Sequence, residues 1–361
     1  MNFLLFRSLV FSAAAGLLLT ACGGERVNDP VTVTQSSLDK ALQELTDNSI
    51  IPAVNDFASQ SAALTNQAEV FCSAPDAAGL TTLQQQWRTL ADSWYHLLPL
   101  NFGPADDDLV FPPYIYIDSL RQRGNNYSAT VRSEINTLLG NTTELNSSYF
   151  DNRNFQYVGL LALEIAIFER ASDASKNITD IVAEYQAQPR KCDIISGLSN
   201  ALQVKADYIR SGWTLNHKAT GKPYRELFLS NQLDDGTPAL TQLLTSAQEF
   251  LDYLQQRNVA TVAAQSSGYN WPLMATAIDS IEEILQGNSA STLSLFSLMT
   301  AAGYDAAVSA VRSNIAAARE NISNQDALLF KSSAAQLDGN FKREIPDGLE
   351  VDLGINFTDG D

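Results

Sequence analysis

The sequence predicts an all-α fold built from two packed helical bundles. Apolar residues recur at steps of three and four over long stretches, which places them on one face of a helix. Alternation at every second residue, the pattern of a half-buried strand, is confined to the short segments 114–117 and 351–357. Clusters of glycine, proline and small polar residues separate the periodic stretches, as is typical of connections between helices.

Four stretches carry the helical period most clearly. The first holds Trp87 and Trp94, which lie seven residues apart and therefore share one helix face, so we expect both in the core. The second follows Cys192. The third opens with Thr237 as the N-cap and Pro238 in the first turn, residue types typical of a helix start. The fourth lies near the C-terminus. The predicted core faces are Leu80, Leu83, Trp87, Leu90, Trp94 and Leu97; Ile195, Leu198, Leu202, Ala206, Ile209 and Trp213; Leu240, Leu243, Ala247, Phe250 and Leu254; and Val308, Val311, Ile315 and Ala318.

The polar stretches between these helices suggest how the chain is divided. A length of 361 residues fits two domains or one large domain. We expect the division where the helical pattern breaks, between residues 172 and 192. It gives an N-terminal bundle at 36–180 and a C-terminal bundle with its tail at 181–361. The predicted connections are residues 103–113, 216–236 and 265–272.

The N-terminus has the layout of an export signal. Arg7 precedes a short apolar run, and small residues lead up to Cys22. The segment Leu19-Thr20-Ala21-Cys22 resembles a bacterial lipobox, which implies that residues 1–21 are a cleaved signal peptide and that Cys22 carries lipid. Residues 22–35 then form a tether to the membrane. Gly23 stands where aspartate would favour the inner membrane, so we expect the outer membrane of a Gram-negative cell envelope. The alternative is an ordinary signal peptide with an incidental cysteine.

The net charge of the chain restricts the kinds of molecule that it can bind. The chain has 23 basic and 41 acidic residues, a net charge of −18, which argues against nucleic acid and against anionic lipid. It fits a solvated exported protein and, more weakly, a cation-handling one. The run Asp106-Asp107-Asp108 is interpreted as a solvated acidic loop, because it lacks the spacing of a calcium loop. The two histidines, His96 and His217, are expected at the surface or at helix ends rather than as metal ligands.

Once Cys22 carries lipid, Cys72 and Cys192 are the remaining cysteines. Two cysteines in an oxidising compartment most simply form a disulfide. A thiol nucleophile or a metal-binding pair is the alternative, and neither cysteine has a histidine close in sequence.

One ionisable side chain stands out. Glu164 is the single charged residue in the apolar segment 158–168, which predicts a central, buried helix. A carboxylate there must be paired, protonated or directed into a cavity, because burying an isolated charge costs several kcal/mol. It is therefore a candidate functional group. The alternative is a structural carboxylate bonded to a buried arginine such as Arg121 or Arg123, or to a tyrosine or tryptophan donor.

At these residues the chain resembles the imelysin family of peptidases and iron-regulated periplasmic or surface proteins. The family signature is Gly-x-His-x-x-Glu on a central helix, and the matching positions here are Gly159, Leu161 and Glu164. The resemblance spans nearly all of residues 36–361. Further matching features are Ile50-Ile51-Pro52, Cys72 before a tryptophan-bearing helix, Phe102-Gly103-Pro104, Cys192 at the start of a helix towards Trp213, and the closing segment 354–361.

The resemblance implies a fold and a role, and one substitution modifies the role. In the family motif, histidine and glutamate three residues apart lie on one helix face and can share a metal ion. Here Leu161 offers no lone pair, and a lone Glu164 is a poor zinc site, so no catalytic residue is assigned. The expected protein is a non-catalytic binding component linked to acquisition of iron or another divalent metal, with a metal or small ligand near Glu164. The sequence identifies no protein partner. The alternatives are an imelysin-type metallopeptidase and a structural or partner-binding lipoprotein that has lost a metal site.

Overall fold

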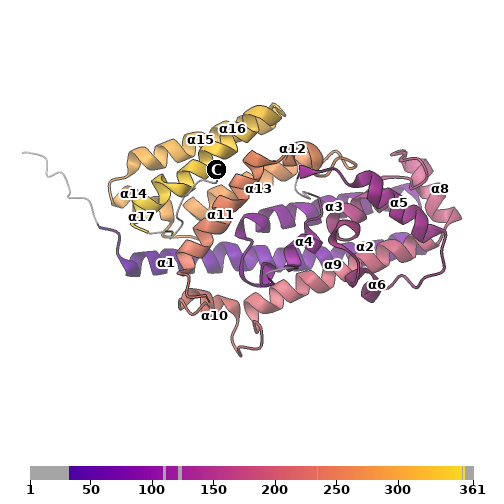
Figure 1. Cartoon of the computed structure of the whole chain (residues 1–361), viewed down its shortest axis with the longest axis horizontal. Coiled ribbons are helices and arrows are strands. Elements are labelled where there is room, and N and C mark those ends of the chain that lie inside the picture. Colours follow the sequence, from indigo (N-terminus) through magenta and orange to yellow (C-terminus); the bar gives the residue numbers. More distant parts are fainter. Residues whose placement is uncertain (1–31, 109–110, 121–123, 234, 352, 354–361) are drawn as a thin grey trace, which may run out of the picture. The chain divides into compact units, whose positions relative to one another are not determined.

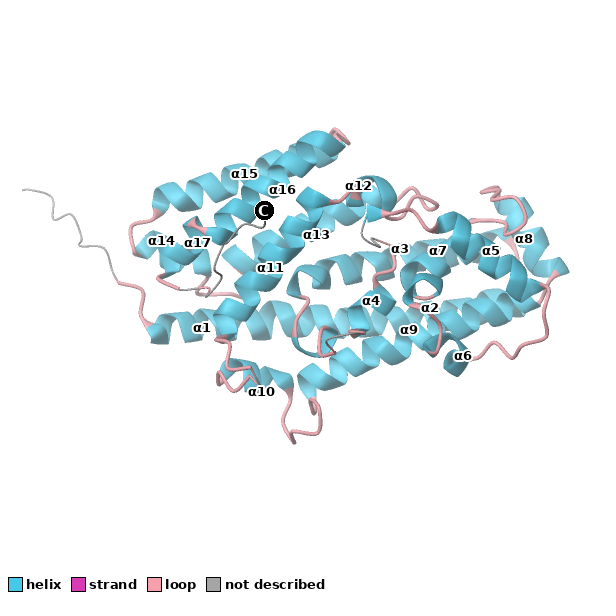
Figure 2. Cartoon of the chain, viewed as in Figure 1, coloured by secondary structure: helices cyan, strands magenta, loops and turns pink. Residues whose placement is uncertain are grey.

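A computed structural model of the chain describes residues 32–108, 111–120, 124–233, 235–351 and 353. These residues form helices joined by loops and include no strand (Figure 2), which confirms the predicted all-α class. The predicted signal peptide, Cys22 and the tail at 354–361 lie outside the described residues. Within the described ranges, no helix is both long and apolar enough to cross a membrane.

The first half of the described chain contains three long helices and several short ones (Figure 1). The apolar helix α7 follows the run of shorter helices α4 to α6 and precedes α8 and the long helix α9. The bounds are α1 Gln35–Leu45, α2 Ile51–Ser73, α3 Ala77–Leu97, α4 Pro113–Ile117, α5 Ser128–Leu139, α6 Ser147–Asp151, α7 Gly159–Phe168, α8 Ile178–Ala187 and α9 Arg190–Thr214.

The second half alternates medium-length helices with short ones. The bounds are α10 Tyr224–Leu229, α11 Ala239–Gln256, α12 Val259–Val262, α13 Asn270–Gln286, α14 Leu295–Ala301, α15 Asp305–Ser323, α16 Ala327–Lys342 and α17 Glu344–Leu349.

Helix α1 continues into α2 through one π-helical turn at Thr46–Ile50. Pro52 follows directly, in the first turn of α2. Proline has no N–H and its ring crowds the carbonyl four residues earlier, so the regular helical ladder is interrupted there. The wider turn absorbs this interruption, and the two helices run on without a loop between them.

The predicted core faces are confirmed: every residue named for the four periodic stretches is buried. Helix α2 packs against both α3 and α9, and α7 packs against α3, α5 and α9. In the second half, α11 and α15 both pack against α16, while α13 contacts α3 and α15. Trp87, Trp94 and Trp213 are fully buried, as expected of core residues.

The described residues form one compact unit, as judged by the contacts between their Cα atoms. Helix α9, which the predicted division assigns to the C-terminal bundle, packs along α2 and α7 of the N-terminal bundle. The division near residue 180 stays a prediction.

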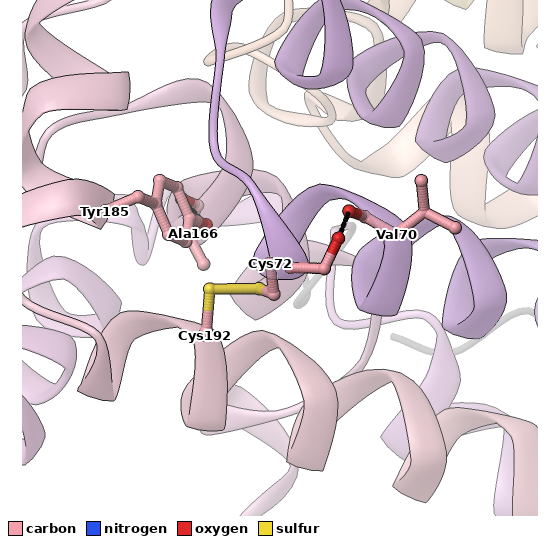
Figure 3. The surroundings of a disulfide bond; sticks show 6 residues. Val70, Cys72, Ala166, Tyr185 and Cys192 are labelled. Atoms are coloured by element: carbon pink, nitrogen blue, oxygen red, sulfur yellow. Dashed lines mark hydrogen bonds between the residues drawn. A yellow bond between two sulfur atoms is a disulfide. The ribbon is translucent and has the colours of Figure 1, made fainter.

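A disulfide joins Cys72 at the end of α2 to Cys192 at the start of α9, with their Cα atoms 5.7 Å apart (Figure 3). Close by, the Tyr185 hydroxyl donates a hydrogen bond to the carbonyl of Ala166 on α7, at 2.9 Å. The disulfide therefore ties together α2 and α9, two long helices that pack against each other.

The structure corrects four local predictions. The alternating segment 114–117 is part of helix α4, because Pro113 presets the backbone of a first helical turn. The predicted connection at 216–236 contains helix α10, and the one at 265–272 ends at Tyr269 because α13 begins at Asn270. Helix α11 starts at Ala239 rather than after Thr237, because the side chain of Asn231 accepts the hydrogen bond of the Ala239 N–H at 2.9 Å.

Candidate functional site

The candidate site is built on α7, in which every residue is buried. Three side chains from neighbouring helices donate hydrogen bonds to its carbonyl groups. Trp87 Nε1 donates to Leu160 at 3.1 Å and Gln84 Nε2 donates to Ile167 at 3.3 Å, in addition to the bond from Tyr185. An apolar helix enclosed in this way holds its side chains in fixed positions, since buried backbone groups need such partners.

Gly159 begins α7 in a conformation that other residues rarely adopt. Its φ is +69°, in the left-handed region. A Cβ atom at this position would lie 2.3 Å from the carbonyl oxygen of Tyr116 and 2.6 Å from that of Ile117. The motif glycine therefore lets the chain around Ile117 pass directly against the start of the helix.

Ser119 lies on the same passing segment and caps the start of α7. Its hydroxyl donates to the carbonyl of Val158 at 2.7 Å and accepts the N–H of Leu161 at 3.0 Å. Because the first N–H groups of a helix lack partners within the helix, this contact stabilises the helix start. The sequence contains no signal for it, since Ser119 is about forty positions away from its partners.

Glu164 is fully buried in the middle of α7. Its Oε1 accepts hydrogen bonds from the N–H of Ser267 at 2.7 Å and from the Ser267 hydroxyl at 2.8 Å. Its Oε2 has no hydrogen-bond partner within the described part of the chain. Burial raises the pKa of this carboxyl to about 7, and the two bonds from Ser267 oppose the shift. The group is therefore suited to holding a proton near neutral pH.

The partner of Glu164 differs from those predicted. Arg121 and Arg123 lie outside the described residues, and the observed donor is a serine in the connection between α12 and α13. The sequence marks this connection only as a break in the helical pattern. Two consecutive serines there face α7: Ser267 binds Glu164, and the Ser266 hydroxyl donates to Glu169 Oε1 at 2.5 Å.

Glu169, just after α7, is held by two further groups. Arg132 Nε donates to its Oε2 at 2.6 Å, and Lys191 Nζ donates to its backbone carbonyl at 2.9 Å. Lys191 itself is fully buried and forms an ion pair with Glu184. Burial lowers the pKa of Lys191, and the Glu184 carboxylate opposes this. These charges are paired, so they form a structural network around the end of α7 rather than free reactive groups.

Leu161 and Glu164 are three residues apart on α7, hence on neighbouring positions of one face. Leu161 is buried and carries no donor atom for a metal. Across the described ranges, no three or more His, Cys, Asp or Glu side chains are arranged to hold a metal ion. The residues at the motif therefore do not fit a catalytic zinc ion, which needs three protein ligands and an open position.

The two histidines have different surroundings. His96 lies in the last turn of α3, and its Nε2 is 2.8 Å from Glu283 Oε2. Glu282, the neighbour of Glu283, instead pairs with Arg319, so the two glutamates point in different directions. His217 is expected at the surface or at a helix end, and the surface location is wrong: the side chain is 4% exposed and packs against the ring of Tyr224 at 5.0 Å between centroids.

Comparisons with known proteins add a family and a fold. The family model described as Imelysin matches residues 50–345. An imelysin-like protein from Psychrobacter arcticum 273-4 has a similar structure, with a TM-score of 0.64 and 19% identity over 90% of this chain and 100% of that one. An iron-regulated protein A precursor from Parabacteroides distasonis ATCC 8503 also has a similar structure. Its TM-score is 0.60, with 13% identity over 88% of this chain and 96% of that one. No functionally curated protein matches the chain. Identities this low show a shared fold alone.

Proposed function

The chain belongs to the imelysin family, and on this premise we propose that it is a non-catalytic binding protein of the cell envelope, linked to the acquisition of iron or another metal. One observation carries the proposal. Where the family motif has histidine, this chain has the buried Leu161, next to a fully enclosed Glu164.

The geometry of the motif supports the non-catalytic part of the proposal. A metallopeptidase needs a metal ion with an open position and a water molecule that the ion activates. One oxygen of Glu164 is already bound by Ser267, and Leu161 cannot complete a ligand pair. The proposal therefore assigns Glu164 a role in holding the segment that contains Ser267 against α7.

The link to metals is supported by the name of one structural neighbour, an iron-regulated protein A precursor. The envelope location is supported by the lipobox-like segment ending in Cys22, which lies outside the described residues. On this proposal Cys22→Ser releases the protein from the membrane fraction while the far-ultraviolet circular dichroism of the folded part stays unchanged. Membrane retention of the variant would contradict the anchoring.

The metal link is tested by starving the source bacterium of iron, copper or zinc in turn. We expect the amount of this protein to rise several-fold on starvation of one of these metals, and we expect its deletion to slow growth in that medium. A constant amount under all three conditions, with normal growth of the deletion strain, would overturn the link.

The non-catalytic role is tested on the purified full chain in detergent. We expect no chelator-sensitive cleavage of unfolded casein. Leu161→His restores the residue pattern of the family motif and provides the matched variant. Cleavage by the unmodified protein that Glu164→Gln abolishes would support the metallopeptidase alternative instead.

A further inference from the structure

A concave site lies on different elements from those that surround Glu164. It is a cavity of about 300 Å³, at the lower end of the volumes typical of ligand pockets. Its wall comes from the turn at Gly103, the loop after α9, helix α10, the segment that follows α10 and the first turns of α11. None of its lining residues takes part in the contacts of Glu164. The residues that matter to the argument are Asp106, Asp107, His217, Tyr224, Leu227 and Leu233.

One side of this pocket is aromatic and rigid. Tyr224 is 6% exposed and packs against Trp213 at 4.8 Å between ring centroids, and His217 packs against Tyr224. Gly103 has φ +59°, and a Cβ atom there would lie 2.5 Å from the Tyr224 ring. The turn that holds Gly103 therefore closes directly onto this ring, which fixes the aromatic wall in place.

The other side carries three carboxylates, Asp106, Asp107 and Asp235, together with one cation, Lys218. Asp107 accepts a hydrogen bond from the Tyr208 hydroxyl, which orients its carboxylate. Within the described ranges, no group donates a hydrogen bond to the side chain of Asp106. Partial burial and the neighbouring charges of Glu249 and Asp107 raise the pKa of Asp106 to about 6, while Lys218 opposes the shift. Lys218 therefore favours the ionised form of Asp106, but in the part of the chain that the structure describes it does not form an ion pair with that carboxylate.

The kind of cation follows from how the pocket is lined. A bare metal ion needs several converging oxygen ligands, and the described side chains of this pocket do not form such a group. Apolar and aromatic surface beside carboxylates suits an ion that has both a charged head and an alkyl part. The net charge of −18 attracts cations of any kind towards the surface.

We propose that this pocket binds a small organic cation, an alkylammonium or guanidinium ion, whose charged group lies at Asp106 and Asp107 and whose alkyl part lies against Tyr224, Leu227 and Leu233. This site is independent of the proposed function, because it uses neither the family motif nor a metal. The acidic run that the sequence marks as a solvated loop is, on this proposal, the charged wall of a binding site.

The test is isothermal titration calorimetry of the full chain in detergent, with n-butylammonium and n-butylguanidinium chloride as probes and neutral 1-butanol as the matched control. We expect saturable one-to-one binding of at least one cation and no binding of the alcohol. Asp106→Asn should weaken binding by about tenfold or more, since it removes a charged hydrogen-bond acceptor. Asp193→Asn, the same charge change at an exposed position of α9 outside the pocket, should leave the affinity unchanged.

Lowering the pH provides a second readout. Binding should weaken between pH 7.5 and pH 5 as Asp106 takes up a proton, and Asp106→Asn should remove most of this dependence. The proposal is overturned if neither cation binds at 10 mM, if Asp106→Asn and Asp193→Asn weaken binding equally, or if calcium displaces the probe at stoichiometric amounts. These outcomes are independent of iron regulation and of membrane location, so they leave the proposed function untouched.

Discussion

Replacing Gly159 by alanine tests whether the motif glycine serves the packing of α7. The new Cβ atom would lie 2.3 Å from the Tyr116 carbonyl oxygen and 2.6 Å from that of Ile117. Both contacts are with backbone, so no flexible side chain can move aside. The left-handed conformation at φ +69° costs about 1–2 kcal/mol for a residue with a Cβ atom. Relieving the overlap costs a further ~1–3 kcal/mol.

We therefore expect Gly159→Ala to lower the free energy of unfolding by about 2–5 kcal/mol, a large part of the ~5–15 kcal/mol typical of a folded protein. Urea unfolding followed by tryptophan fluorescence measures it, because Trp87 donates its indole hydrogen bond to Leu160, the next residue on α7. A shift of the start of α7 caused by the new methyl group should therefore change the fluorescence of the folded state as well as the urea midpoint.

Gly221 provides the matched control. It has a similar φ of +76°, but no atom lies within 4 Å of the position of its Cβ. Gly221→Ala should cost only the conformational part, about 1–2 kcal/mol. Equal losses for the two variants would refute the argument that close packing of the chain at Ile117 onto α7 requires glycine.

Three further predictions concern the surroundings of α7. The folded-state pKa of Glu164, about 7, lies above the unfolded value of 4.5, so its stabilising contribution is complete below pH 4.5 and is lost as pH rises to 7. This titration should lower the free energy of unfolding of the unmodified protein by roughly 3 kcal/mol between pH 4.5 and pH 8. Urea unfolding of Glu164→Gln over the same pH range should lack this decrease. Replacing Cys72 and Cys192 by serine should lower the free energy of unfolding by about 4–5 kcal/mol, because the disulfide closes a loop of 120 residues. Lys191→Met should cost about 3–5 kcal/mol in thermal or urea unfolding by leaving Glu184 buried without its partner, and adding Glu184→Gln should recover much of that loss.

Each of these three has a result that would contradict it. An unchanged pH profile in Glu164→Gln would mean that another group titrates in this window. A serine pair that unfolds at the same urea concentration as the oxidised protein would show that the disulfide adds no stability. Equal stability of Lys191→Met and the unmodified protein would show that the buried pair does not offset the burial of Glu184.

Much of the fold is present in the spacing of apolar residues. The faces through Trp87 and Trp94, and through Trp213, follow the helical period and are buried as predicted. Such a period is a local property of the chain, so it can be read without knowledge of distant segments. Where local rules mislead, a contact elsewhere decides the outcome: Asn231 sets the start of α11 although Thr237-Pro238 has the residue types of a helix start.

The candidate site likewise has features that the sequence predicts and features that only distant contacts determine. The apolar segment around Glu164 predicts a buried central helix and a carboxylate that needs a partner, and the sequence also places Gly159 and Leu161 relative to it. The sequence does not identify that partner, because Ser267 lies 103 positions away in a connection with no pattern of its own. His217 is another example: a polar neighbourhood in the sequence suggests the surface, whereas the fold buries the ring against Tyr224.

The sequence by itself determined the helical class, the core faces and the family, because each depends on residue types at short, regular spacings. Only the tertiary structure decided which groups surround Glu164, how the chain at Ile117 passes Gly159, and that Asp106 lines a pocket with Tyr224. These are tertiary contacts between segments far apart along the chain, and they depend on how the helices pack. Packing is set by the sum of many weak contacts, and no single local pattern records it.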